Sequence, residues 1–184
     1  NFFSDATTSA MSAVINNAAL IKKVYMPKYL FVISRVFSSF INLLASFTAL
    51  LVVMIATRAE LHWKVVFAVI PLGFIVVFSL GVGLLLSALV VKFRDIMHLY
   101  SVFITALLYL TPVIYPMSSL PYWMQKVVGL NPITNILMMF RDVMLYDNFP
   151  NLSSILIATI ESLAALGIGV YVFYKKQDEF ILNI

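Results

Sequence analysis

A long apolar segment without any charge is the feature that most constrains this chain. Residues 65–91 contain no charged side chain, and the sequence Lys92-Phe93-Arg94-Asp95 follows at once. A helix of that length extends about 40 Å, which exceeds the roughly 30 Å hydrocarbon core of a bilayer. Overall, 62% of residues are hydrophobic and 11% are charged, unlike soluble domains. The sequence therefore predicts an all-α integral membrane protein, a polytopic helical bundle.

Charged residues divide the chain into the segments that we expect to cross or enter the membrane. We expect one domain over residues 1–184, truncated at its N-terminus, because the chain begins without Met. Small and polar residues in the first segment favour packing against other helices rather than lipid. The predicted segments are a partial second span at 1–21, spans at 29–57, 65–91, 96–112 and 151–174, and a connecting segment at 17–28.

The region between the last two spans, residues 113–146, is unusual because it is apolar and yet interrupted by prolines. Pro112, Pro116 and Pro121 each lack an amide donor and cannot continue a regular helix. Irregular backbone at membrane depth is tolerated where protein or a water-filled cavity surrounds it. We therefore predict a re-entrant helical hairpin before the last span, with its second short helix starting at Asn131-Pro132, since proline after a polar cap residue is favourable at a helix start. An external loop with an interfacial helix is the alternative.

The distribution of Lys and Arg indicates the orientation of the spans. Of the twelve basic residues, eight fall at one set of span ends, and the positive-inside rule makes that side cytoplasmic. These eight are Lys22, Lys23, Lys28, Arg35, Lys92, Arg94, Lys175 and Lys176. The four on the opposite side are Arg58, Lys64, Lys126 and Arg141.

The connecting segment at 17–28 is too apolar for a solvated loop. Spacings of three and four place four apolar residues on one helical face: Leu20, Ile21, Val24 and Tyr25. Such an element lies on the membrane or docks into a groove of a partner. The simpler alternative is that its lysines only set the orientation and that Pro27 opens the next helix.

Other motifs have structural explanations beside functional ones. The Arg94–Asp95 pair is an orientation signal, or its charge-assisted hydrogen bond sets the angle between helices. Gly81, Gly83 and Ser87 form a small-residue face suited to close helix packing. Glu161 is a carboxylate inside a span, either a proton or substrate site or a packed polar contact.

Signals of catalysis are absent from the sequence. His62 and His98 are far apart and lack a carboxylate at metal-site spacing, and the chain has no cysteine. Neither the phosphate-binding G-x-x-x-x-G-K loop nor the G-x-S-x-G elbow occurs. We therefore expect a protein that is not an enzyme, with no catalytic, cofactor or metal site and no nucleic-acid partner.

A series of short motifs carries a resemblance to a known family. In order they are Asn16-Asn17, the run from Leu20 to Lys28, Phe93-Arg94-Asp95-Ile96, Thr111-Pro112-Val113-Ile114-Tyr115-Pro116, Leu130-Asn131-Pro132 and Phe140-Arg141. This series resembles the permease subunit of ABC type-2 exporters of polysaccharides or teichoic acids, the O-antigen and capsule export group. Met26 departs from the Phe or Tyr usual in that family.

The resemblance implies a division of labour between subunits. A separate subunit binds ATP and Mg²⁺, and two permease copies form a channel for a lipid-linked glycan in the bacterial cytoplasmic membrane. The residues implied for coupling to the ATPase are Asn17, Leu20, Ile21, Lys22, Lys23, Val24, Tyr25, Met26 and Pro27. An exporter of a drug, lipid or peptide, or a membrane enzyme or anchor of envelope assembly, is the alternative function.

The resemblance also places the proline-rich region near the external mouth of the channel. The residues implied for the glycan passage are Tyr109, Pro112, Tyr115, Pro116, Tyr122, Trp123, Asn131 and Arg141. Aromatic rings with polar tips suit the faces of a sugar. The alternative for the aromatic residues is an ordinary aromatic belt at the membrane interface.

Overall fold

The computed structural model describes residues 1–23, 26–58, 63–113 and 115–180, and within these ranges every regular element is a helix. The α-helices are α1 (Phe2–Asn16), α2 (Ala18–Lys23), α3 (Tyr29–Ala56), α4 (Val69–Val90), α5 (Ile96–Leu110), α6 (Tyr122–Gly129), α7 (Pro132–Leu145) and α8 (Leu152–Lys176). Short 3₁₀ turns are η1 (Trp63–Ala68), η2 (Met117–Ser119) and η3 (Gln177–Glu179). The predicted all-α class is confirmed.

Three of these helices are long and apolar enough to cross a membrane. They are α3, with 28 residues, the continuous helix formed by η1 and α4, also with 28, and α8, with 25. Their outer surfaces carry exposed aliphatic side chains such as Val52, Ile160 and Leu163. Large apolar surfaces of this kind require lipid or protein around them, in agreement with the predicted integral membrane protein.

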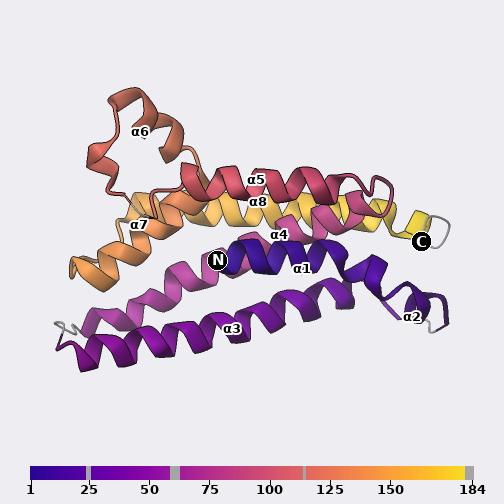
Figure 1. Cartoon of the computed structure of the whole chain (residues 1–184), viewed down its shortest axis with the longest axis horizontal. Coiled ribbons are helices and arrows are strands. Elements are labelled where there is room, and N and C mark those ends of the chain that lie inside the picture. The colour runs from indigo at the N-terminus through magenta and orange to yellow at the C-terminus, as the bar shows by residue number, and fades with distance from the viewer. Residues whose placement is uncertain (24–25, 59–62, 114, 181–184) are drawn as a thin grey trace.

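The centre of the bundle is α4, which packs against α1, α3 and α8 (Figure 1). Glycines allow a backbone-to-backbone contact between α4 and α8: a Cβ on Gly169 would lie 2.1 Å from the carbonyl oxygen of Gly81. A Cβ on Gly83 would lie 2.8 Å from that of Ala10 in α1. The small-residue face predicted from Gly81, Gly83 and Ser87 is therefore a packing surface, with Ser87 buried.

Figure 1 shows that the connections between helices gather at two ends of the bundle. At one end, here called the α2 end, lie residues 17–23, 26–28, 91–95 and 175–180. At the other, the α7 end, lie the outer ends of α3 and η1 and residues 111–113 and 115–151. The basic segments predicted to share one side of the membrane are thus at the same end of the bundle.

The α7 end is held together by one lysine and a group of aromatic rings. Lys64 Nζ lies 3.1 Å from Asp147 Oδ2 and donates a hydrogen bond of 2.7 Å to the Asp147 carbonyl oxygen. The same ammonium lies 4.9 Å from the ring centre of Phe149. Trp63 and Phe67 contact that ring edge to face. Lys64 therefore joins the start of η1 to the connection between α7 and α8.

Helix α5 is shorter and less embedded than its neighbours. It has 15 residues, a length of about 22 Å at 1.5 Å per residue, and Tyr100 is its buried residue. The Tyr100 hydroxyl donates a 2.6 Å hydrogen bond to Thr7 Oγ1 in α1. The helix ends at Leu110, and Thr111 is extended, because a residue before proline avoids the helical region. Pro112 thus ends this helix, as predicted.

Candidate functional site

The α2 segment begins with a turn organised by Asn17. The Asn17 side chain donates a 2.7 Å hydrogen bond to the Ala13 carbonyl, which closes the end of α1. The Asn17 carbonyl accepts hydrogen bonds of 3.0 Å from the amides of Leu20 and Ile21, which opens α2. One residue thus ends α1 and starts the short helix that leads toward α3.

The structure divides the apolar residues that were predicted to share one face of this segment. Leu20 is 53% exposed, whereas Ile21 is 8% exposed and packs in the main core. Val24 and Tyr25 lie outside the described residues. Of the described pair, only Leu20 therefore presents its side chain to a partner, while Ile21 attaches α2 to the bundle.

The remainder of the predicted coupling residues lie on the surface of the α2 end. Lys22, Lys23, Met26 and Pro27 are exposed. The Pro27 carbonyl accepts a 3.1 Å hydrogen bond from the amide of Leu30, which starts α3. The segment thus presents apolar and basic side chains together.

The connection between α4 and α5 lies at the same end of the bundle. Lys92, Phe93, Arg94 and Asp95 are all exposed, and Lys92 Nζ lies 5.7 Å from the ring centre of Phe93. Among the residues that the structure describes, Arg94 and Asp95 form no ion pair with each other. The alternative in which such a pair sets the angle between α4 and α5 therefore has no support from this conformation.

At the α7 end, Asn131 connects the end of α5 to the start of α7. Its side-chain nitrogen donates a 3.1 Å hydrogen bond to Thr111 Oγ1, and its side-chain oxygen accepts one of 3.1 Å from the amide of Ile133. Pro132 occupies the first helical turn, where the missing amide costs nothing. The helix start predicted from Asn131 and Pro132 is confirmed.

Arg141 makes a second connection across the same turn. Its guanidinium donates a 2.7 Å hydrogen bond to the carbonyl of Val113, and the neighbouring Pro112 is fully buried. Both Asn131 and Arg141 thus hold the 111–113 turn against α7. These contacts give the two polar residues and the proline a structural role in the hairpin-like region.

The aromatic residues predicted for the passage have different surroundings. Tyr109, Tyr122 and Trp123 are each more than 65% exposed, and Lys126 Nζ lies 4.7 Å from the ring centre of Tyr122. The Tyr115 hydroxyl instead donates a 2.7 Å hydrogen bond to the carbonyl of Tyr109. Pro116 is exposed at the start of η2. Three rings are therefore available at the surface, while Tyr115 stabilises the turn.

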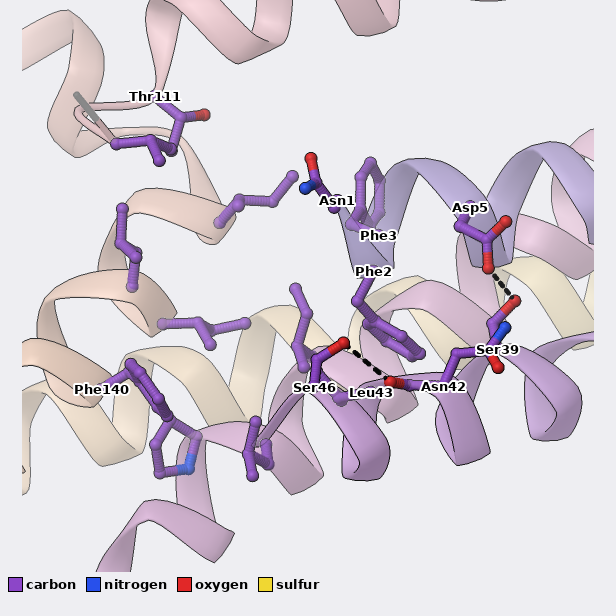
Figure 2. A pocket seen from close by; sticks show the side chains of 17 residues that line it. Asn1, Phe2, Phe3, Asp5, Ser39, Asn42, Leu43, Ser46, Thr111 and Phe140 are labelled. Atoms are coloured by element: carbon purple, nitrogen blue, oxygen red, sulfur yellow. Dashed lines mark hydrogen bonds between the residues drawn. The ribbon is translucent and has the colours of Figure 1, made fainter. Parts of the chain in front are cut away.

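A cavity of about 530 Å³ lies between the first turn of α1, α3, α4 and α7 (Figure 2). Its lining is largely apolar, and on one side the Ser39 hydroxyl donates a 2.6 Å hydrogen bond to Asp5 Oδ2. Asn42 and Ser46 of α3 and Thr111 after α5 also line it. None of the four aromatic residues predicted for the passage contributes to its wall.

The sequence-based predictions did not include this polar group. A signal was present, because Ser39, Asn42 and Ser46 recur at spacings of three and four in α3, which places them on one face. Asp5 had no such signal, since its contact with Ser39 joins two different helices.

Comparison with known proteins identifies the family to which this architecture belongs. Residues 1–145 match the ABC-2 type transporter family. The O-antigen export system permease protein RfbA of Myxococcus xanthus is 24% identical over 185 aligned positions, covering 100% of this chain and 71% of that protein. The protein of the same name from Klebsiella pneumoniae is 24% identical over 181 positions, covering 97% and 69%. The chain therefore belongs to the ABC-2 type transporter family.

Proposed function

We propose that this chain is the permease subunit of an ATP-driven exporter that moves a lipid-linked polysaccharide across the bacterial cytoplasmic membrane. The observation that carries the proposal is the family match over residues 1–145 on a fold with three apolar helices long enough to span. Relatives named as O-antigen export permeases align along nearly the whole chain, which supports a polysaccharide as the cargo.

The α2 end is the cytoplasmic end in this proposal. Seven of the eight basic residues predicted inside belong to the segments gathered there or adjoin them, and Arg35 lies in the second turn of α3. Lys and Arg are retained preferentially on the cytoplasmic side of membrane proteins. The α7 end then faces outward, and the chain is a multi-pass membrane protein.

Energy for transport comes, in this proposal, from a separate ATP-binding subunit that docks on the α2 segment. Leu20, Lys23 and Met26 are all exposed in this segment, and apolar anchors with a basic rim suit docking into a partner's groove. ATP and Mg²⁺ are bound by the partner, and two copies of the permease enclose the passage, as the family resemblance implies.

The proline-rich region enters the membrane from the outside and returns. Helices α4 and α5 both have an end at the connection of residues 91–95, and α4 has 22 residues against 15 in α5. At 1.5 Å per residue α5 stops about 10 Å short of the outer end of α4. The turn at 111–113, which Asn131 and Arg141 hold against α7, then lies within bilayer depth. Thr111 and Pro112 are buried in protein there, as irregular backbone in a membrane requires.

A reconstituted system tests the proposal directly. The permease and its partner ATPase are placed in proteoliposomes, and movement of a lipid-linked glycan is measured with and without ATP. ATP-dependent glycan movement is the expected result. Movement of a drug or peptide without movement of any lipid-linked glycan would overturn the polysaccharide assignment.

A pair of leucine variants tests the docking surface. Leu20→Asp places a charge in the proposed interface and is expected to weaken association with the ATPase at least tenfold, because an unpaired buried charge is strongly unfavourable. Leu152→Asp is the matched control: Leu152 is exposed at the α7 end as the first residue of α8, where an acidic side chain is favourable. Equal association of both variants would show that Leu20 is not at the interface.

A further inference from the structure

The residues that follow α8 in the described part of the chain pack against the bundle. After α8 the turn η3 leads to Phe180, which is 1% exposed. Its ring lies 5.3 Å from that of Phe173 at an interplanar angle of 85°, an edge-to-face contact. Phe180 belongs to the main core cluster together with Ile21 and Val91. The C-terminal turn therefore packs among the segments of the α2 end.

Lys28 provides a polar contact to the same turn. It immediately precedes α3 as its N-cap, and its ammonium donates a hydrogen bond to the carbonyl of Gln177. The same nitrogen lies 5.7 Å from the ring centre of Phe180. The Gln177 carbonyl also accepts a hydrogen bond from the Phe180 amide within η3, so Lys28 adds a second donor to a carbonyl at the end of α8. Lys28 thus contacts both the backbone and the terminal ring of a turn that lies 149 residues later in the chain.

Two contacts, one near each end of the α2 segment, therefore attach this segment to the C-terminal turn and the core cluster around it. Near its start, Ile21 packs in the cluster that contains Phe180; at its end, Lys28 is bonded to Gln177. The same segment carries the exposed Leu20 and Met26 that the proposed docking surface uses. The turn is continuous with α8, which contacts α4 backbone to backbone through Gly169 and Gly81.

We infer that the C-terminal turn is a positioning element of the exporter, in which Phe180 and Lys28 hold the α2 segment on the end of α8. Movement imposed on α2 by a partner then reaches α8 and α4 through this contact. The inference rests on the proposed docking of an ATPase at α2. Phe180 is a positioning residue, since it is buried and touches neither nucleotide nor cargo in this arrangement.

The test measures glycan moved per ATP hydrolysed. Phe180→Ala removes the buried ring, whereas Tyr174→Ala removes an exposed aromatic ring from the neighbouring helix α8 and serves as the control. Phe180→Ala is expected to keep membrane insertion and ATPase association within about twofold of the parent and to lower the glycan-to-ATP ratio about tenfold. Phe180→Leu, which refills most of the site, is expected to restore at least half of that ratio. An unchanged ratio in Phe180→Ala would overturn the inference.

A cross-link keeps the inference testable where Phe180→Ala lowers the amount of folded protein. The chain has no cysteine, so Lys28→Cys and Gln177→Cys introduce a unique pair that a short bismaleimide can join. In the Phe180→Ala background the joined pair is expected to regain a high glycan-to-ATP ratio, and the unjoined pair is not. Failure of the joined pair to regain it counts against the positioning role.

The two proposals fail in distinguishable ways. If Leu20→Asp leaves ATPase association intact, the docking surface at α2 is wrong whatever Phe180→Ala does. If Leu20→Asp abolishes association while Phe180→Ala leaves the glycan-to-ATP ratio unchanged, the docking surface stands and the positioning role of the C-terminal turn is wrong.

Discussion

At each end of the bundle, one lysine joins segments that are far apart in the sequence. The two lysines differ in the groups that they contact. At the α7 end Lys64 pairs with the Asp147 carboxylate and also contacts a backbone carbonyl and the Phe149 ring. At the α2 end Lys28 contacts a carbonyl and the Phe180 ring, and no carboxylate pairs with it among the side chains that the structure describes.

This difference bears on how easily each end can rearrange. Separating Lys64 from its partner leaves the Asp147 carboxylate unpaired, and that side chain is only 36% exposed, so the separation is unfavourable. Separating Lys28 leaves the Gln177 carbonyl with its hydrogen bond from the Phe180 amide, and water can occupy the position of the lost donor. The α7 end is therefore the more fixed of the two, and the α2 end is the one that a partner can displace.

The comparison of the two ends requires that they lie on opposite sides of the membrane. Labelling of single cysteines tests this, because each cysteine is expected to react from one side only. Cysteines replacing Lys22 and Lys92 are expected to react with an impermeant maleimide only from the cytoplasmic side. Cysteine at Tyr146, which is exposed at the α7 end, is expected to react only from outside. Reaction of Tyr146→Cys from inside would require a further crossing and would remove the re-entrant arrangement.

The largest effect on stability is expected at the contact between α4 and α8, because α8 extends from the α7 end of the bundle to the α2 end. A methyl group at Gly169 would lie 2.1 Å from the Gly81 carbonyl, and overpacking of this kind costs about 3 kcal/mol. Gly169→Ala is therefore expected to lower the midpoint of thermal unfolding sharply in detergent. Gly167→Ala is the control, because a methyl group there would meet nothing within 4 Å, and no loss of stability is expected.

Intermediate effects on stability are expected when Lys64 and Lys28 are replaced, and their sizes compare the two lysines directly. Lys64→Met leaves Asp147 without its ion-pair partner and is expected to destabilise the α7 end by about 1 to 2 kcal/mol. Lys28→Met is expected to cost less than about 1 kcal/mol, because it removes one hydrogen bond and one ring contact but strands no charge. Hydrogen exchange of amides near each end measures both. A larger loss of protection at Lys28 than at Lys64 would reverse the comparison.

The smallest effect is expected from the exposed rings of the α7 end. Tyr109→Ala, Tyr122→Ala and Trp123→Ala combined are expected to slow movement of long glycans several-fold while leaving ATPase association unchanged, since stacking contacts with sugar are lost far from α2. Tyr171→Ala, on an exposed face of α8, controls for loss of an aromatic ring elsewhere. Unchanged movement in the triple variant would identify the rings as interfacial anchors.

Much of the fold was predictable because hydropathy and proline are local signals. The spans expected at 29–57, 65–91 and 151–174 correspond to α3, η1 with α4, and α8 within a few residues. The start of α7 followed from Asn131 and Pro132, since an amide-accepting cap before proline is a strong helix start. The close packing of α4 followed from its glycines, although their partner Gly169 did not.

The remaining features depend on contacts between distant segments, which periodicity does not contain. Leu20 and Ile21 are adjacent in an apolar segment, and only the position of α2 against the core decides which is exposed. Phe180 gave no signal, because its burial depends on where α8 ends relative to α2. The Asp5–Ser39 and Lys64–Asp147 contacts likewise join segments far apart in sequence.

The glycine contact between α4 and α8 has a consequence for how the protein changes shape. Because Gly169 meets the Gly81 carbonyl without any intervening side chain, sliding or rotation of one helix would drive a neighbouring side chain into the other. We therefore expect the two helices to move as one unit. Shape changes during a transport cycle then occur where this unit contacts other helices, and the contact with α5, which is attached through the Tyr100–Thr7 hydrogen bond, is weaker than those with α1, α3 and α7.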